Sequence, residues 1–140
     1  MNTNQLHSTK GLSILVVDDD SALRWLMCKQ LELCGFDVDQ AENGLVAVRL
    51  FENNRYCLIF MDIQMPHMDG LQATAAIRCH EEQMRREPTP IIATTAGGAS
   101  REVCLRVGMS DYLAKPVDMD KLELVLKRWK CSSSSAEFVF

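Results

Sequence analysis

The sequence predicts an α/β fold in which a five-stranded parallel sheet carries helices on both faces. Short segments rich in apolar and β-branched residues alternate five times with segments whose apolar residues recur at helical spacing. The apolar segment around residues 57–63 shows no polar alternation, which is typical of a central strand buried on both faces. With 140 residues, 47% of them hydrophobic, the chain suits one domain with a packed core.

The individual elements follow from capping and turn signals along the chain. Asp20 and Ser21 are suited to begin the first helix, and Gly35 to end it. Polar and apolar residues alternate in 36–41, which favours a strand nearer an edge, while Pro88 ends the longest helix. The predicted strands are 12–17, 36–41, the run within 57–66 that contains Asp62, 90–95 and 111–114, and the predicted helices are 21–34, 47–53, 71–84, 101–107 and 119–129.

Composition and charge exclude several classes of protein. The formal net charge is -4 and the sequence pI is about 5.3, which argues against nucleic-acid binding because that function needs a basic face. No apolar run approaches the ~18 residues that span a bilayer. Residues 1–11 lack the apolar core of a signal peptide. We therefore expect no direct contact with nucleic acid or membrane.

Most of the chain is expected to form the folded domain. Residues 1–11 predict a flexible lead, residues 12–130 the domain, and residues 131–140, which begin with Cys131 and four serines, a linker or tail. The six cysteines include no Cys-x-x-Cys pair. We therefore expect reduced thiols in a cytosolic protein, with a zinc site or a disulfide framework as the alternative.

Carboxylates follow two of the predicted strands. Asp18, Asp19 and Asp20 come after the first strand, and Asp62 ends the third. If these strands are neighbours, Asp18, Asp19 and Asp62 meet at one edge of the sheet, where ligands bind in open α/β folds. Their mutual repulsion then either raises pKa values or attracts a cation, and oxygen ligands of this kind favour Mg²⁺. The simpler alternative is helix capping together with a solvated acid in a loop.

A lysine and a threonine end two other predicted strands. Lys115 follows the short strand 111–114 and precedes Pro116, which restricts the local backbone. Thr95 ends the fourth strand. An ammonium group and a hydroxyl at the same edge as the acids are suited to bind phosphoryl oxygens. A surface lysine and an ordinary strand-end threonine are the alternatives for these two residues.

Together these strand-end motifs resemble a known family. They are Asp18-Asp19 after Ile14–Val17, the run Met61-Asp62-Ile63-Gln64-Met65-Pro66 with Met68-Asp69-Gly70, the pair Thr95-Ala96, and the run Tyr112-Leu113-Ala114-Lys115-Pro116. With one motif at each strand end in this order, residues 12–130 resemble the receiver domain of two-component response regulators. The resemblance implies a flavodoxin-like, doubly wound sheet of order 2-1-3-4-5 flanked by five helices.

The resemblance also implies a role for each site residue. Asp62 matches the phosphoacceptor. Mg²⁺, or Mn²⁺ in its place, is implied to bind Asp19, Asp62 and the backbone carbonyl of Gln64 directly, and Asp18 through water. The phosphoryl group is implied to bind Thr95, the backbone of Ala96 and Lys115, while Thr95 and Tyr112 act as the switch. The residues implied to set the loop geometry are Pro66, Gly70 and Pro116. Gly97-Gly98 departs from the family pattern, where many relatives carry larger or polar residues.

The function implied is Mg²⁺-dependent transfer of a phosphoryl group from a phosphohistidine to Asp62 in a phosphorelay. The expected donor is a histidine kinase or a histidine phosphotransfer domain, and the expected output is an effector or a dimer bound through the face near strands four and five. The motifs around Asp62 and Lys115 are similar to receivers of hybrid histidine kinases, although a stand-alone relay protein is also compatible. Such a domain is cytoplasmic, with tethering where the parent kinase is membrane-bound. It phosphorylates and dephosphorylates itself without being an independent turnover enzyme.

Two other functions are compatible with parts of the sequence. Asp18-Asp19-Asp20-Ser21 loosely resembles the nucleophile loop of haloacid-dehalogenase-type phosphatases, with Asp18 attacking and Asp20 as the acid. That alternative leaves the motif around Asp62 unexplained. The other is an adaptor that binds its partner without phosphorylation, against which the complete set of acids, threonine and lysine argues.

Overall fold

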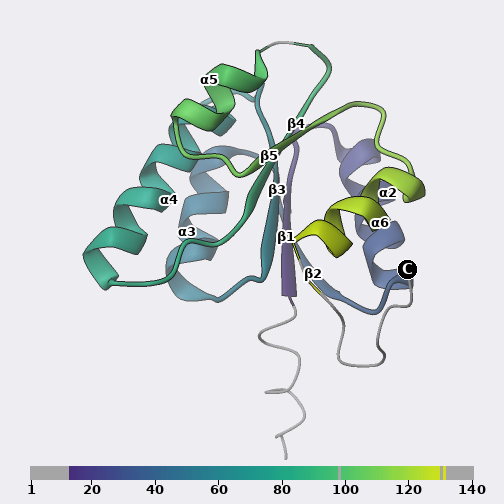
Figure 1. Ribbon diagram of the computed structural model, residues 1–140, viewed down its shortest axis with the longest axis horizontal. Helices are drawn as coiled ribbons and strands as arrows, with labels where there is room; N and C mark the ends of the chain where they lie inside the picture. The colour runs from purple at the N-terminus through teal and green to yellow at the C-terminus, as the bar shows by residue number, and fades with distance from the viewer. Residues whose placement is uncertain (1–12, 98, 130, 132–140) are drawn as a thin grey trace, which may run out of the picture.

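The structure, a computed structural model, describes residues 13–97, 99–129 and 131 (Figure 1). Strands and helices alternate throughout, as the sequence predicts. In chain order they are β1 (Ser13–Val17), α2 (Ser21–Leu33), β2 (Asp37–Ala41), α3 (Gly44–Asn53), β3 (Leu58–Asp62), α4 (Gly70–Met84), β4 (Ile91–Thr95), α5 (Arg101–Arg106), β5 (Asp111–Ala114) and α6 (Met119–Arg128).

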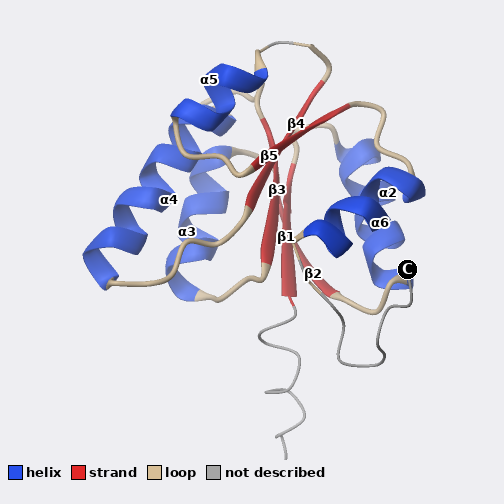
Figure 2. Ribbon diagram, in the orientation of Figure 1, coloured by secondary structure: helices blue, strands red, loops and turns tan. Residues whose placement is uncertain are grey.

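The five strands form one parallel sheet of order β2-β1-β3-β4-β5, which confirms the predicted order. All five residues of the central strand β3 are buried, as its uninterrupted apolar pattern predicts. The polar strand β2 lies at an edge, also as predicted. Figure 2 shows the sheet between two helical layers, with α2 and α6 on one face and α3, α4 and α5 on the other.

The core consists of one apolar cluster on each face of the sheet. Because side chains alternate along a strand, β1 contributes Ile14 and Val16 to one cluster and Leu15 and Val17 to the other. The helices cover these clusters with fully buried residues such as Phe51 and Ile77 on the α3–α5 side and Leu31 and Leu122 on the α2–α6 side. Polar side chains of β1 and β3 are therefore confined to the strand ends, where the candidate site lies.

Side-chain caps fix where each helix begins. Asp20 accepts hydrogen bonds from the N–H groups of Ala22 and Leu23 at the start of α2, as predicted. Gly35, with φ 94°, ends this helix, also as predicted. The other caps at helix starts are Asn43, Asp69, Ser100 and Asp118. Asp69 and Gln72 form a reciprocal capping box at α4.

The structure differs from the sequence prediction at several boundaries. The second predicted helix, which is α3, begins at Gly44 rather than at residue 47, because Asn43 caps it. The predicted lead and most of the predicted tail lie outside the described residues. Cys131, predicted as the first residue of that tail, is instead 5% exposed and packs in the α2–α6 core. In the described part of the chain, no helix combines the length and the apolarity that crossing a membrane requires.

The prediction that all the cysteines are reduced is wrong for two of them. Cys57 and Cys131 form a disulfide across 74 residues of sequence. Their spacing gives no signal for this pairing, because they meet only when α6 folds back onto the sheet beside β3. Cys28, Cys34, Cys79 and Cys104 are free thiols, as predicted.

Candidate functional site

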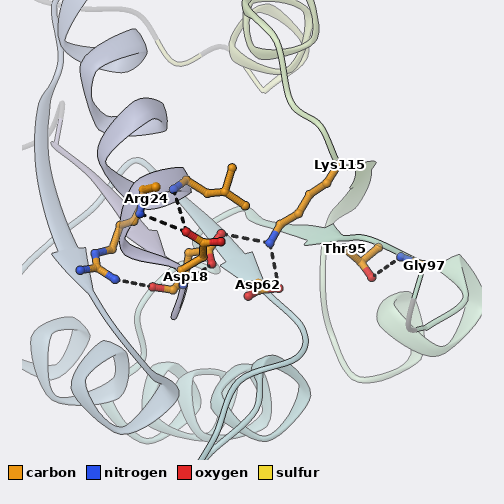
Figure 3. Close-up of polar contacts among 9 residues, drawn as sticks. Asp18, Arg24, Asp62, Thr95, Gly97 and Lys115 are labelled. Carbon is orange, nitrogen blue, oxygen red and sulfur yellow. Dashed lines mark hydrogen bonds and ion pairs between the residues drawn. The ribbon is translucent and has the colours of Figure 1, made fainter.

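The candidate site lies where β1, β3, β4 and β5 end at the same edge of the sheet. Asp62 is the last residue of β3, and Asp18 directly follows β1, whose Val17 pairs with Met61. Thr95 ends β4 and Lys115 directly follows β5. Figure 3 shows the Lys115 side chain reaching toward Asp18 and Asp62. The parallel topology thus brings together residues that are far apart in the sequence, as predicted.

Three carboxylates form the acidic cluster of the site. Asp18, Asp19 and Asp62 each offer an oxygen atom, and these atoms all lie within 4.8 Å of one another. Asp18 and Asp62 are each 5% exposed, whereas Asp19 is exposed. Carboxylate oxygens at this spacing, with one side open to water, fit Mg²⁺, which binds through one or two carboxylates and keeps several waters.

Lys115 lies between the two buried acids. Its Nζ atom is 3.1 Å from Oδ2 of Asp18 and 3.4 Å from Oδ1 of Asp62. The lysine side chain is 18% exposed, so one cation is shared by two buried carboxylates away from bulk water. The sequence alternative of an ordinary surface lysine is therefore wrong.

The electrostatics of the cluster favour binding of a further cation. Burial and the negative charge of Asp18 raise the pKa of Asp62 to about 7, even though Lys115 acts in the opposite direction. Burial alone lowers the pKa of Lys115, but the hydrogen bond and charge of Asp18, together with Asp62, raise it above its ordinary value. One lysine does not neutralise three acids, so a divalent ion bound here relieves the remaining repulsion.

Arg24 supports the acidic loop and was missed by the sequence analysis. Its guanidinium group donates a 2.7 Å hydrogen bond to the backbone carbonyl of Asp18 and a 3.0 Å bond to Oε1 of Gln40. Figure 3 shows this arginine on the side of Asp18 opposite Lys115. The available signal was a basic residue early in α2, where the helix dipole disfavours positive charge and a local acceptor is needed.

The loop after β3 depends on a glycine. The N–H of Gly70 donates to the carbonyl of Ile63 at 2.9 Å. A Cβ atom at Gly70 would overlap the carbonyl oxygen of Asp62 and lie 2.9 Å from Cα of Ile63. The carbonyl of Pro66 accepts from the N–H of Met68 at 2.8 Å, which closes the turn before α4. Gly70 thus lies against the backbone that presents Asp62, and the Pro66 carbonyl holds the turn that leads to α4.

The remaining predicted site residues lie around the acids. Thr95 is 1% exposed, and its Oγ1 accepts a 3.1 Å hydrogen bond from the N–H of Gly97. Tyr112 is half-buried and donates from its hydroxyl to the carbonyl of Ala99 at 3.2 Å. Both therefore contact the loop after β4. The other predicted positions are Gln64, exposed in the loop after β3; Ala96, exposed after Thr95; and Pro116, which follows Lys115 through a cis peptide bond.

An apolar pocket adjoins the site and was also missed by the sequence analysis. It has a volume of about 310 Å³ and reaches from Asp18 and Lys115 to α2. Leu23 and Leu26 line it and are 41% and 46% exposed. The other lining residues are Met27, Gln30, Ala96, Pro116 and Val117.

The geometry also weighs against the phosphatase alternative. Asp18 Oδ1 accepts from the N–H of Asp20, and Asp18 Oδ2 pairs with Lys115, so its carboxylate is engaged on both oxygens. The carboxylate of Asp20 caps α2 and is therefore committed to the helix. The arrangement favours Asp62 as the reacting carboxylate.

Comparisons with known proteins agree with this fold and site. Residues 14–127 match the response regulator receiver domain family. Hybrid signal transduction histidine kinase G of Dictyostelium discoideum is 41% identical over 129 residues, which cover 89% of this chain but only 4% of that kinase. The chain thus spans a small part of the length of this curated relative.

Two solved structures place the similarity within receiver domains. One is the receiver domain of sensor histidine kinase PA1611 from Pseudomonas aeruginosa PAO1, with a magnesium ion coordinated in its active site cleft. The match to it has a TM-score of 0.75 and 40% sequence identity, and it covers 85% of this chain and 97% of that receiver domain. The other is from the co-crystal structure of the Saccharomyces cerevisiae histidine phosphotransfer protein Ypd1 with the receiver domain of Ssk1, with TM-score 0.79 and 30% identity over 88% of this chain and 91% of that one. The chain described here belongs to the response regulator receiver domain family.

Proposed function

We propose that Asp62 of this receiver domain accepts a phosphoryl group from a phosphohistidine. The donor is a histidine kinase or a histidine phosphotransfer domain, and the domain acts within a hybrid histidine kinase or as a stand-alone relay protein. The observation that carries this proposal is the position of Lys115 Nζ, 3.1 Å from Asp18 and 3.4 Å from Asp62, in a cluster where Asp19 adds a third carboxylate. Asp62 can serve as the acceptor, and focused positive charge stabilises the charge on the transferred phosphoryl group.

The proposed reaction uses Asp62 as the nucleophile. One carboxylate oxygen forms a bond to phosphorus while the bond between phosphorus and the donor histidine nitrogen breaks, which gives an aspartyl phosphate. A pKa of about 7 leaves a substantial ionised fraction of Asp62 at neutral pH. Lys115 stabilises the charge on the phosphoryl oxygens, and the Thr95 hydroxyl and the Ala96 backbone bind one of them.

Magnesium completes this proposed site. Asp19 and Asp62, the backbone carbonyl of Gln64, and Asp18 through water would hold the ion, which would supply positive charge that stabilises the phosphoryl oxygens. The Arg24 contact to the Asp18 carbonyl holds the loop that carries two of these acids. Arg24 is thus a positioning residue in this proposal.

Phosphorylation is proposed to switch the surface near β4 and β5. Thr95 Oγ1 accepts from Gly97 N–H, and Tyr112 donates to Ala99, so both residues hold the same loop. A phosphoryl group on Asp62 draws the Thr95 hydroxyl toward the site, and Tyr112 then takes the space that it leaves. The altered face binds a downstream effector or a second copy of the domain. We propose a cytoplasmic location, with tethering where the parent kinase is membrane-bound.

Mass spectrometry after incubation with acetyl phosphate and Mg²⁺ tests this function. We expect the wild-type chain to gain one phosphoryl group, and the variants Asp62→Asn and Lys115→Ala to gain little or none. An undiminished gain in Asp62→Asn would reject the proposal. Steady release of phosphate from a generic ester would instead support the phosphatase alternative, and partner affinity that ignores both Mg²⁺ and the phosphodonor would support the adaptor.

A further inference from the structure

The disulfide between Cys57 and Cys131 joins two segments that no sequence signal connects. Cys57 immediately precedes β3, and Cys131 lies just beyond the end of α6. Their Cα atoms are 6.4 Å apart, within the range that a disulfide spans without backbone movement. The N–H of Cys57 donates to the carbonyl of Ser13, and the N–H of Cys131 donates to the carbonyl of Leu126. Backbone hydrogen bonds therefore position both cysteines.

This pair lies at the amino-terminal end of β3, whereas Asp62 lies at the carboxyl end of the same strand. Cys57 precedes the first residue of β3 and Asp62 is the last, so at about 3.3 Å per residue the strand separates them by roughly 16 Å. Figure 1 shows the end of α6 near the start of the strands, away from the loops at their carboxyl ends. Chemistry at this pair therefore does not compete with chemistry at Asp62.

Contacts other than the disulfide also hold α6 against the sheet. Leu122, Val125 and Leu126 of this helix are buried against the α2–α6 core. Lys121 donates to the carbonyls of Ala114 and Pro116 at 3.2 and 3.0 Å, which ties the other end of the helix to the Lys115 loop. Reduced cysteines are small apolar residues that suit such a core. These contacts of α6 do not involve the disulfide and would remain when it opens.

Three of the four remaining cysteines have raised pKa values. Burial raises the pKa of Cys28 to about 11 and raises the pKa of Cys34 and Cys104 above the ordinary value, which lowers the fraction of reactive thiolate. Cys79 is exposed but belongs to α4 in the opposite helical layer. Within the pair, Cys57 is half-buried whereas Cys131 is buried. Cys57 is therefore the sulfur that an external thiol or disulfide reaches first.

We propose that Cys57 and Cys131 form a reversible redox modification site that fastens the end of α6 to the start of β3. The oxidant is a low-molecular-weight disulfide such as oxidised glutathione. The Cys57 thiolate attacks one glutathione sulfur, giving a mixed disulfide and one free glutathione. The Cys131 thiolate then attacks the Cys57 sulfur, forming the S–S bond and displacing the second glutathione. The two protein thiols lose two electrons and two protons, and the oxidant accepts them.

Thiol mapping of the full chain tests the proposal. The reduced protein is incubated with oxidised glutathione under native conditions, and its peptides are then mapped by mass spectrometry. We expect a Cys57–Cys131 link in the wild type and in the control Cys79→Ser, and no such link in Cys57→Ser or Cys131→Ser. A different pairing, or no link in the wild type, would overturn the proposal.

Two further measurements test whether the disulfide is reversible and whether it restrains the end of α6. Dithiothreitol without denaturant should open the bond while far-ultraviolet circular dichroism stays unchanged; a bond that opens only in denaturant, or a reduced chain that unfolds, contradicts reversibility. Oxidation should raise the melting temperature by at least about 5 °C, because it restricts the unfolded chain, and should slow amide exchange at the end of α6. Equal amide exchange at the end of α6 in the oxidised and reduced proteins would show that the disulfide does not fasten this helix. Cys79→Ser must show the same shifts as the wild type.

Discussion

The Lys115 Nζ atom lies 3.4 Å from Oδ1 of Asp62, although these residues belong to the ends of β5 and β3, with β4 between them in the sheet. The contact exists because every strand runs in the same direction, so all carboxyl ends meet at one edge. The long lysine side chain then spans the intervening strand. Its charge partly offsets the repulsion between Asp62 and Asp18, and this balance determines how the site responds to substitution.

Replacing Lys115 by alanine should destabilise the metal-free protein at pH 8. Asp18 and Asp62 are then buried without their cation, and a loss of about 1–3 kcal/mol in the free energy of unfolding is expected. The loss should be smaller at pH 5, where Asp62 is protonated. Urea denaturation in the presence of a chelator measures both values. Lys29→Ala, which removes an exposed ion pair with Glu32, is the matched control and should change stability by less than about 0.5 kcal/mol.

Replacing Asp62 by asparagine should stabilise the metal-free protein above pH 7. The pKa of Asp62 is about 7 in the folded state and near its ordinary value of 3.8 in the unfolded state, so between these pH values the folded state binds a proton that the unfolded state releases. Stability of the wild type therefore falls as pH rises through this window, and Asp62→Asn should exceed it by about 1–3 kcal/mol at pH 8. Denaturation curves at several pH values test this, and an unchanged pH slope in the variant would contradict it. The exposed Asp19 is the matched position, and Asp19→Asn should have a smaller effect.

Adding a methyl group at Gly70 should disturb the end of β3. The new Cβ would overlap the Asp62 carbonyl oxygen, and relief requires movement of backbone rather than of a flexible side chain. Gly70→Ala should therefore lower the free energy of unfolding by roughly 1–3 kcal/mol. Gln83→Ala, at an exposed position of the same helix, controls for the alanine substitution. Equal stability of the two variants in urea would show that the loop accommodates the methyl group.

Asp111 should show the opposite pH dependence to Asp62. Burial alone raises its pKa, but hydrogen bonds from the Tyr112 N–H, Trp129 Nε1 and the Arg128 guanidinium lower it below the ordinary value. The folded state thus releases this proton more readily than the unfolded state, and the stability gained is present at neutral pH and lost on acidification. Asp111→Asn should cost about 1–3 kcal/mol at pH 7.

The cost of Asp111→Asn should shrink as the pH falls through the lowered pKa of Asp111. Denaturation of the variant and the wild type at matched pH values measures this difference. Asp37→Asn, at an exposed position of β2, provides the control. A cost that does not depend on pH would show that the charge of Asp111 is not what stabilises the fold.

The arrangement of the acids and the lysine was predictable because it depends on topology. Alternating strands and helices impose a parallel sheet, and polar residues at strand ends must then share an edge. The proximity of Asp62 to Asp18 and Lys115 needs no knowledge of individual rotamers. The apolar run that ends in Asp62 also identified the central strand correctly.

Contacts that depend on side-chain conformation were not predictable in this way. Arg24 reaches the Asp18 carbonyl through one specific side-chain conformation, and a helical arginine has many others. Asp111 lies at the start of β5, where a polar residue is usually solvated, and its burial depends on how Trp129 and Arg128 cover it. The Cys57–Cys131 pair depends on where the chain returns after α6.

The most direct test of the account is to identify the phosphorylated residue chemically. The chain is treated with acetyl phosphate and Mg²⁺ and then with borohydride, which reduces an aspartyl phosphate to homoserine, and its peptides are sequenced by mass spectrometry. We expect homoserine at position 62. Homoserine at another aspartate such as Asp18, or a phosphoryl group that borohydride leaves in place, would contradict it.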